Sequence, residues 1–228
     1  MLLLLIPAAL AFDHAPLQQT LTAYVDGSGR VNYAAVHETG ALDGYLTALA
    51  SAAEPAAGPA RMAFWINAYN ALTIDMMADN WPIASIRDLD NGNPWDARTF
   101  TVAGRQVTLN DIEHKILRPM GDPRIHAAVN CASRGCPPLP ASAFTAAALD
   151  AQLTAASRRW ITTNGVRIDA NANTVKLNQI FDWYGDDFVP GANGDIPGVD
   201  GKQEAALLFA AGLLAEDQAA WLRAGGYN

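Results

Sequence analysis

The chain has little positive charge. It contains 15 lysine and arginine residues against 23 aspartate and glutamate residues, and its formal net charge at pH 7 is −8. No stretch of the sequence forms a basic stripe. Because nucleic acids and anionic membranes attract proteins mainly through lysine and arginine, the composition argues against both as partners.

Long hydrophobic runs are also missing. The apolar run at residues 1–11 is shorter than the roughly 20 residues that a membrane-spanning helix needs. It contains Pro7 and ends in Ala9-Leu10-Ala11, which is typical of a secretory cleavage site. We therefore predict a signal peptide at residues 1–11 and a periplasmic or secreted mature protein with no integral membrane segment. A buried N-terminal helix is the alternative interpretation.

Several motifs that would indicate a cofactor or a known catalytic site are absent. The sequence has no G-x-G-x-x-G, no Walker phosphate loop, no H-E-x-x-H and no G-x-S-x-G. Asp169-x-Asn171-x-Asn173 begins like a calcium-binding loop, but Thr174 and Ile180 replace the required glycine and glutamate. We expect no cofactor and no calcium site.

Composition and periodicity predict the fold class. Half of the residues are hydrophobic and 17% are charged, as in soluble globular proteins. We predict a single helix-rich α+β domain over residues 12–228, packed around a small, mostly antiparallel sheet that includes two hairpins at 100–108 and 166–177. The predicted helices are residues 17–25, 42–50, 61–80, 109–118, 141–160, 178–188, 203–214 and 216–224.

Two predicted helices carry polar residues in apolar surroundings. Asn67 and Asn70 share one face of the helix at 61–80, and buried amides must hydrogen-bond to backbone, to a ligand or to a catalytic group. Glu113 falls inside the apolar arc of the helix at 109–118, and His114 lies at its border. Since an unpaired acid in a core costs several kcal/mol, Glu113 needs a partner such as an arginine, or a function.

Residues 122–138 hold both cysteines of the chain. Apolar residues alternate with others from 125 to 130, which predicts a short strand that ends at Cys131. Catalytic and binding residues often lie where a helix or strand ends and a loop begins. On such a strand His126 and Cys131 face opposite ways, so the spacing favours His114 as the base for Cys131.

The two cysteines allow three interpretations. Cys131 and Cys136 form a disulfide, whose short loop is worth roughly 2 kcal/mol. Alternatively, Cys131 is a nucleophile with His114 or His126 as its base. In the third, Cys and His side chains bind a metal ion, although the C-x4-C spacing is looser than in a usual zinc site. A redox-active pair would combine the first two. The residues that could orient the base are Asn67, Glu113 and Asn130.

Six motifs, spread over residues 61–188, resemble a known bacterial family. They are Phe64-Trp65-Ile66-Asn67-Ala68-Tyr69-Asn70-Ala71-Leu72, Leu109-Asn110-Asp111-Ile112-Glu113-His114, Asp122-Pro123-Arg124-Ile125-His126, Asn130-Cys131-Ala132-Ser133, Cys136-Pro137 and Ile180-Phe181-Asp182-Trp183-Tyr184. In these the chain resembles the domain of unknown function 547. The resemblance marks as site residues Asn67, Glu113, His114, Arg124, His126, Cys131 and Cys136.

These features predict a cleft between the helix that carries Asn67, the helix that carries Glu113 and the loop at Cys131. The leading hypothesis is a cysteine-centred enzyme that performs acyl transfer, hydrolysis or thiol exchange on a peptide-like or thiol-containing small molecule. The predicted catalytic residues are Asn67, Glu113, His114 and Cys131. The predicted ligand-binding residues are Asn70, Arg124, His126 and Asn130. The alternative is a non-catalytic binding module, shaped by a disulfide, in which Arg124 holds a ligand carboxylate.

Overall fold

The computed structural model describes residues 12–227. The predicted signal peptide at residues 1–11 lies outside these residues. Within them, no helix is long and apolar enough to cross a membrane. The first four helices are α1 (Ala15–Tyr24), α2 (Tyr33–Thr39), α3 (Asp43–Ala50) and α4 (Gly58–Asp79).

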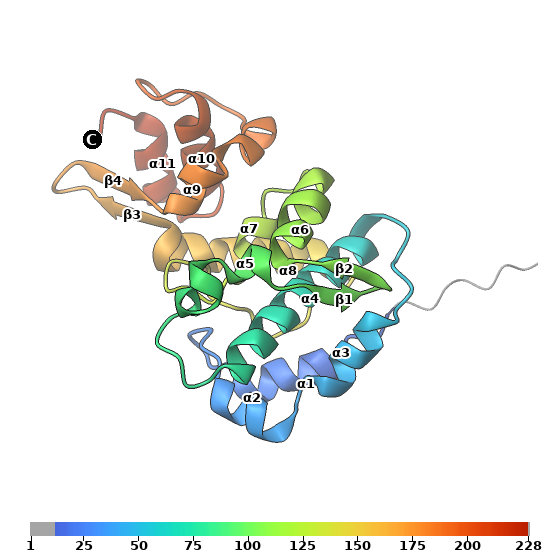
Figure 1. The fold of residues 1–228 in the computed structure, drawn as a ribbon. Helices are drawn as coiled ribbons and strands as arrows, with labels where there is room; N and C mark the ends of the chain where they lie inside the picture. The colour runs from blue at the N-terminus through green and yellow to red at the C-terminus, as the bar shows by residue number, and fades with distance from the viewer. Residues whose placement is uncertain (1–11, 228) are drawn as a thin grey trace, which may run out of the picture.

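Helix α4 lies in the middle of the larger part of the molecule (Figure 1). Pro59 occupies its first turn, where a missing N–H is tolerated because it has no partner within the helix. Sixteen of the 22 residues of α4 are buried, and Phe64, Trp65 and Ile66 have no exposed surface. Apolar side chains cover the helix on all sides, so neighbouring elements must surround it. The predicted helix at 61–80 is confirmed.

Both predicted hairpins are confirmed, but they do not form one sheet. Strand β1 (Phe100–Val102) pairs antiparallel with β2 (Arg105–Val107) through a turn in which Ala103 and Gly104 have positive φ angles of 50° and 71°. Strand β3 (Val166–Asp169) pairs with β4 (Thr174–Leu177) in a separate two-stranded unit. The class is therefore helix-rich α+β, with two small antiparallel hairpins.

The predicted strand at 125–130 is wrong, because residues Ile125–Ala128 form the one-turn helix α7. The carboxylate of Asp122 accepts the backbone N–H of Arg124 at 3.0 Å, and Pro123 stands between them. An aspartate followed by proline is a helix start as well as a chain breaker. All four residues of α7 are buried, so their alternation in polarity did not reflect two faces of a strand. The preference for His114 as the base depended on that strand and loses its support.

The predicted helix at 109–118 is present but irregular. It begins as α6 (Leu109–Asp111), where Thr108 and Asp111 form a capping box. It continues as a π-helical turn (Ile112–Leu117) and a 3₁₀ turn (Arg118–Met120). Wide π turns often occur at functional sites, since the extra residue turns a side chain toward a new direction.

The predicted helix at 141–160 starts later than expected. Helix α8 spans Leu149–Trp160 and continues as a π-helical turn (Ile161–Gly165). The residues before it form a loop, because side chains from other elements hydrogen-bond its backbone. Gln18 accepts the N–H of Ala143 at 3.0 Å, and Asn67 accepts that of Phe144 at 2.9 Å.

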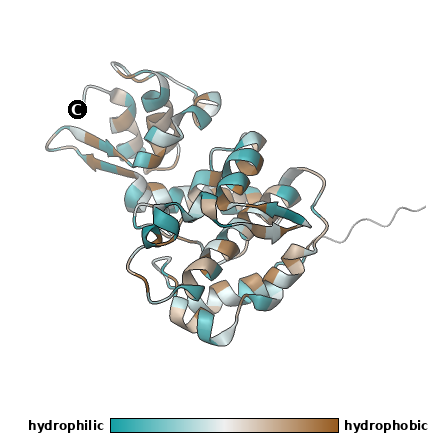
Figure 2. Ribbon diagram, viewed as in Figure 1, coloured by the Kyte–Doolittle hydropathy of each residue, from teal (hydrophilic) through white to brown (hydrophobic). Residues whose placement is uncertain are grey.

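The C-terminal elements form a smaller group at one end of the molecule, together with β3 and β4 (Figure 1). In Figure 2 hydrophobic and hydrophilic residues alternate along most helices, as expected for helices with one buried face. The remaining helices and turns are 3₁₀ turns at Ile86–Asp88 and Asp90–Gly92, α5 (Pro94–Ala97), α9 (Gln179–Trp183), 3₁₀ turns at Gly185–Asp187 and Val189–Gly191, α10 (Gly201–Ala211) and α11 (Glu216–Ala224).

An aromatic contact joins the C-terminal group to α8. The rings of Trp160 and Phe181 are stacked with centroids 4.7 Å apart, and Trp160 has no exposed surface. We expect Trp160→Ala to lower the free energy of unfolding, measured in urea, by about 3–5 kcal/mol, because it empties a packed site. Trp183→Ala is the matched control, since Trp183 is 58% exposed and its loss should cost about 0.5 kcal/mol or less. Equal losses in both variants would contradict this role of Trp160.

Candidate functional site

A cavity of about 600 Å³ lies between α4, the π-helical turn at Ile112–Leu117, α7, the loop that carries both cysteines, and α9. Its walls include Tyr69, Glu113, His126, Cys131 and Trp183. This volume is typical of sites that bind a small molecule. The predicted cleft is therefore present, with the C-terminal group as one further wall.

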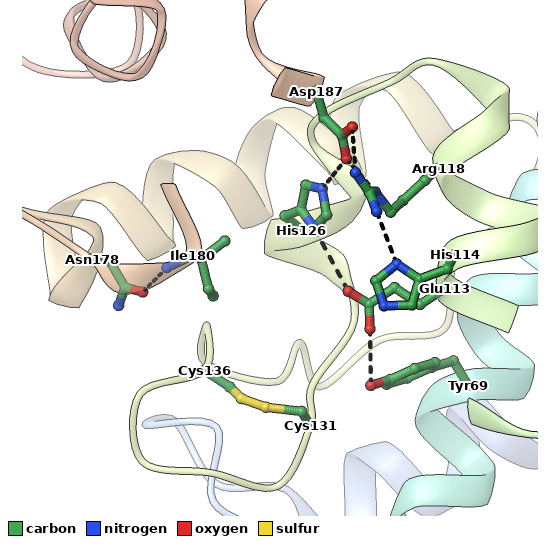
Figure 3. A network of polar contacts seen from close by, with 10 residues as sticks. All are labelled: Tyr69, Glu113, His114, Arg118, His126, Cys131, Cys136, Asn178, Ile180 and Asp187. Atoms are coloured by element: carbon green, nitrogen blue, oxygen red, sulfur yellow. Dashed lines mark hydrogen bonds and ion pairs between the residues drawn. A yellow bond between two sulfur atoms is a disulfide. The ribbon is translucent and has the colours of Figure 1, made fainter. Parts of the chain in front are cut away.

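His126 lies between two carboxylates at the edge of this cavity (Figure 3). Its Nε2 is 2.7 Å from Oδ2 of Asp187, which is a short hydrogen bond. Its Nδ1 is 3.9 Å from Oε1 of Glu113 on the other side. The His126 side chain is 1% exposed and that of Glu113 is 12% exposed. The two acids therefore act on the imidazole with little screening by water.

Arg118 neutralises Asp187. Its Nε and Nη2 donate to the two carboxylate oxygens at 2.7 and 2.9 Å, and its Nη1 donates to Nδ1 of His114 at 2.9 Å. Burial opposes ionisation of Asp187, but the hydrogen bonds from His126 and Arg118 outweigh it and hold the pKa of this carboxyl well below its usual value. Asp187 is therefore ionised and accepts a hydrogen bond from the Nε2–H of His126. In the neutral imidazole this leaves the Nδ1 lone pair facing Glu113.

Two tyrosines complete the surroundings of Glu113 and His126. Tyr69 donates from its hydroxyl to Oε2 of Glu113 at 3.4 Å, and burial together with that carboxylate raises the pKa of Tyr69 far above its usual value. The ring of Tyr184 stacks on His126 with centroids 4.4 Å apart. Burial and then Glu113 also raise the pKa of Tyr184. Both phenols therefore stay protonated, and that of Tyr69 donates a hydrogen bond to Glu113.

Four of the predicted site residues line the same cavity, namely Glu113, His126, Cys131 and Cys136. His114 is not among the lining residues. Its ring lies against Tyr184 with centroids 5.8 Å apart, and its Nδ1 accepts from Arg118. Of the two predicted bases, His126 is the one that the structure places at the cavity.

The predicted asparagines hold backbone segments. Asn67 bonds both the N–H and the carbonyl of Phe144, at 2.9 and 2.8 Å. Asn70 donates to the carbonyl of Ala128 at 2.9 Å and accepts the N–H of Asn130 at 2.9 Å. The amide of Asn130 in turn bonds backbone within the cysteine loop. These amides have the backbone partners that were one of the predicted alternatives.

Arg124 does not line the cavity. Its guanidinium binds both carboxylate oxygens of Asp122, at 2.7 to 3.2 Å, and Asp150 at 2.8 Å. A further bond of 2.9 Å runs to the hydroxyl of Thr154. Its donors are thus used by the protein itself, and it fixes the start of α7 against α8.

Sequence reasoning missed Tyr69, Arg118, Tyr184 and Asp187. Arg118 follows His114 by four residues, so helical spacing could have placed these two side chains together. The need for a partner at Glu113 was correctly predicted, but its partners are His126 and Tyr69, while the arginine binds Asp187. Nothing local distinguishes Asp187 from its exposed neighbour Asp186.

Cys131 and Cys136 lie at disulfide distance, with Cα atoms 6.1 Å apart. Within residues 12–227 no free cysteine is present, and no hydrogen bond joins either sulfur to a histidine. In the same part of the chain, no group of three or more His, Cys, Asp or Glu side chains is arranged to hold a metal ion.

The fold and the cavity define a helix-rich α+β protein with a cavity of the size that small molecules occupy. Residues 55–161 match the model of the family described as "Protein of unknown function, DUF547". The match covers 107 of the 228 residues and confirms the predicted resemblance to the DUF547 family. No curated protein and no solved structure matches it. The matched segment contains Glu113, His126 and both cysteines, whereas Tyr184 and Asp187 lie beyond its end.

The lowered pKa of Asp187 predicts a pH-dependent contribution to stability. The ionised form is favoured in the folded protein, so the contribution is present above the usual pKa of 3.8 and is lost as the pH falls below it. We expect the difference in free energy of unfolding between the native protein and Asp187→Asn, measured in urea, to be largest near neutral pH and to shrink below about pH 4.

The matched control is Asp186→Asn, since Asp186 is exposed and pairs only with the exposed Lys202. It should lower the free energy of unfolding by less than about 1 kcal/mol, with little pH dependence. A pH-independent difference for Asp187→Asn would contradict the ionised network.

Proposed function

We propose that this protein is an enzyme that performs acid–base chemistry on a small, peptide-like molecule bound in the cavity. The observation that carries the proposal is the position of His126 between Asp187 and Glu113 on the cavity wall. A histidine with one nitrogen bound to a carboxylate has a fixed orientation and tautomer, so His126 presents its other nitrogen to Glu113, the group that carries the proton in this proposal.

Each group has a distinct role in this proposal. Glu113 takes a proton from water that attacks a carbonyl carbon, and it returns a proton to the leaving nitrogen or oxygen as the substrate bond breaks. The Nδ1 lone pair of His126 faces Glu113 and favours the form of Glu113 that holds the proton, and Asp187 with Arg118 fixes the orientation of the imidazole. Tyr69 holds the second oxygen of Glu113 in position. General acid–base groups of this kind typically contribute about 10²- to 10⁴-fold to a rate.

The residues that line the cavity suit a small, peptide-like substrate. Trp95 and Trp183 offer flat apolar surfaces, and the side chains of Asn93, Asn110 and Gln179 also line the space. Amide side chains can pair with the N–H and C=O groups of a peptide-like molecule, while aromatic rings pack on its apolar parts.

We expect Glu113→Gln to lower turnover by at least about 10²-fold, because glutamine cannot carry the proton. The measurement is release of chromophore from a panel of p-nitrophenyl esters and p-nitroanilides of amino acids and dipeptides. Glu216→Gln is the control, since Glu216 lies in the exposed first turn of α11, and its activity should be unchanged. Thermal melting of each variant verifies folding. Turnover by Glu113→Gln at the native rate would exclude Glu113 as the proton carrier.

A cysteine-dependent enzyme is the second candidate, favoured by the presence of Cys131 on the same cavity. In reduced protein its thiolate could attack a carbonyl, with His126, which lines the cavity, as the base in place of His114. The paired substitution Cys131→Ser/Cys136→Ser distinguishes the two. It retains turnover under the acid–base proposal and loses it if the thiolate is the nucleophile.

A binding module without catalysis would give a third outcome. Calorimetric titration would then find a peptide-like ligand that binds the native protein and Glu113→Gln within a few-fold of each other, with no product formed. Such a result would overturn the enzymatic proposal while leaving the cavity as a ligand site.

We further propose that the protein is exported. The cysteine pair at disulfide distance supports this, because disulfides persist mainly outside the cytosol. Mass spectrometry of the mature protein, alkylated with and without prior reduction, tests it. Export predicts an N-terminus at Phe12 and cysteines that react only after reduction, whereas an intact residue 1 would contradict it.

A further inference from the structure

The loop between the two cysteines is held by hydrogen bonds that do not involve sulfur. At its start, the side chain of Asn70 accepts the N–H of Asn130 at 2.9 Å. Asn130 itself accepts the N–H of Ala132 at 2.9 Å and donates to the carbonyl of Pro137 at 2.7 Å, so it bridges the two ends of the loop.

The far end of the loop is fixed from two other elements. Asn164 donates from its side chain to the carbonyl of Cys136 at 3.2 Å, and Asn178 donates to that of Gly135 at 3.1 Å. Asn178 is held in turn, since its oxygen accepts the N–H of Ile180 at 3.0 Å (Figure 3). Both ends of the loop are therefore positioned from α4, from the π-helical turn after α8 and from the start of α9.

These bonds close the same short loop that a covalent bond would close, so the Cys131–Cys136 bond adds little to the shape. From this redundancy we propose that the cysteine pair is a redox-active site that exchanges with a low-molecular-weight thiol bound in the cavity. The hydrogen bonds preserve the loop when the sulfur–sulfur bond opens. The inference does not require the acid–base chemistry of Glu113 and extends beyond it.

The two sulfurs differ in access, which sets their roles. Cys131 is partly exposed on the cavity wall, whereas Cys136 is 7% exposed. An incoming thiolate forms a bond to the sulfur of Cys131, and the Cys131–Cys136 bond breaks with Cys136 leaving as a thiolate. Attack by a second thiolate on the bound thiol releases a disulfide and leaves Cys131 as a thiolate. Two electrons pass from two thiols to the protein, and their protons go to solvent.

The dimensions of the cavity indicate a small thiol. At about 600 Å³ the space accommodates a molecule of peptide size, and its walls combine aromatic rings with amide side chains. Cys131 lies on the wall of this cavity. A small thiol can enter the cavity more readily than can a cysteine side chain that belongs to another folded protein.

The experiment uses glutathione and its disulfide as probes on the folded chain. Reduced Cys136→Ser protein is mixed with glutathione disulfide, and reduced Cys131→Ser protein is treated in parallel as the matched control. Adducts are located by peptide mass spectrometry over time. We expect a single adduct on Cys131, formed at least tenfold faster than any adduct on Cys136. An adduct on Cys131 is expected in Cys136→Ser/Glu113→Gln as well, which keeps the test separate from the acid–base proposal.

A second measurement needs no substitution at the cysteines. Native protein is equilibrated with reduced glutathione, and its thermal melting and near-ultraviolet circular dichroism are recorded beside the fraction of open pair. We expect the pair to open without unfolding and the melting temperature to fall by only a few degrees. Asn130→Ala, which removes the bridge across the loop, should enlarge that fall on opening.

Four results would overturn the proposal. They are adducts that form equally fast on both cysteines, no adduct on folded protein, loss of tertiary structure when the pair opens, and an unchanged fall in melting temperature in Asn130→Ala. A faster reaction with an oxidised protein than with glutathione disulfide would overturn the choice of a small thiol.

Discussion

The burial of α4 on every side is the constraint on which the rest of the structure depends. A buried amide must find hydrogen-bond partners, and in this helix each buried asparagine finds them on the backbone of a segment far away in the sequence. Asn67 holds the loop before α8, and Asn70 holds the segment between His126 and Cys131. Tyr69, between them, reaches Glu113. Tyr69 and Asn70, adjacent on one helix, thus fix the position of Glu113 and of the segment that joins His126 to Cys131.

The charged side chains of the site are largely shielded from water, and this explains why they form a single network. An isolated ion in such a place would cost several kcal/mol, so each carboxylate must face a donor. Asp187 accepts two hydrogen bonds from Arg118 and one from His126. Glu113 accepts a hydrogen bond from Tyr69 and faces His126. Asp187 comes from the C-terminal group, beyond the segment that matches the family model. The site is therefore complete only when that group packs on α7 and α8.

Local patterns predicted much of the fold. The helix at 61–80, both hairpins and the polar anomaly at Glu113 follow from periodicity, from turn residues and from the cost of a buried acid, all of which act over a few residues. The same reasoning failed at 125–130, where four buried residues in one helical turn imitate the alternation of a strand. It also extended α8 too far, because hydrogen bonds from Gln18 and Asn67 keep the preceding residues in a loop.

Candidate site residues could thus be recognised one by one from the amino-acid sequence, but their partners could not. The sequence predicted four site residues that the structure places at one cavity, namely Glu113, His126, Cys131 and Cys136. The pairing of His126 with Asp187 spans 61 residues, and that of Asn70 with Ala128 spans 58. Propensity and periodicity act within a turn or a strand, whereas such pairings depend on how whole helices pack, and only the tertiary structure decides them.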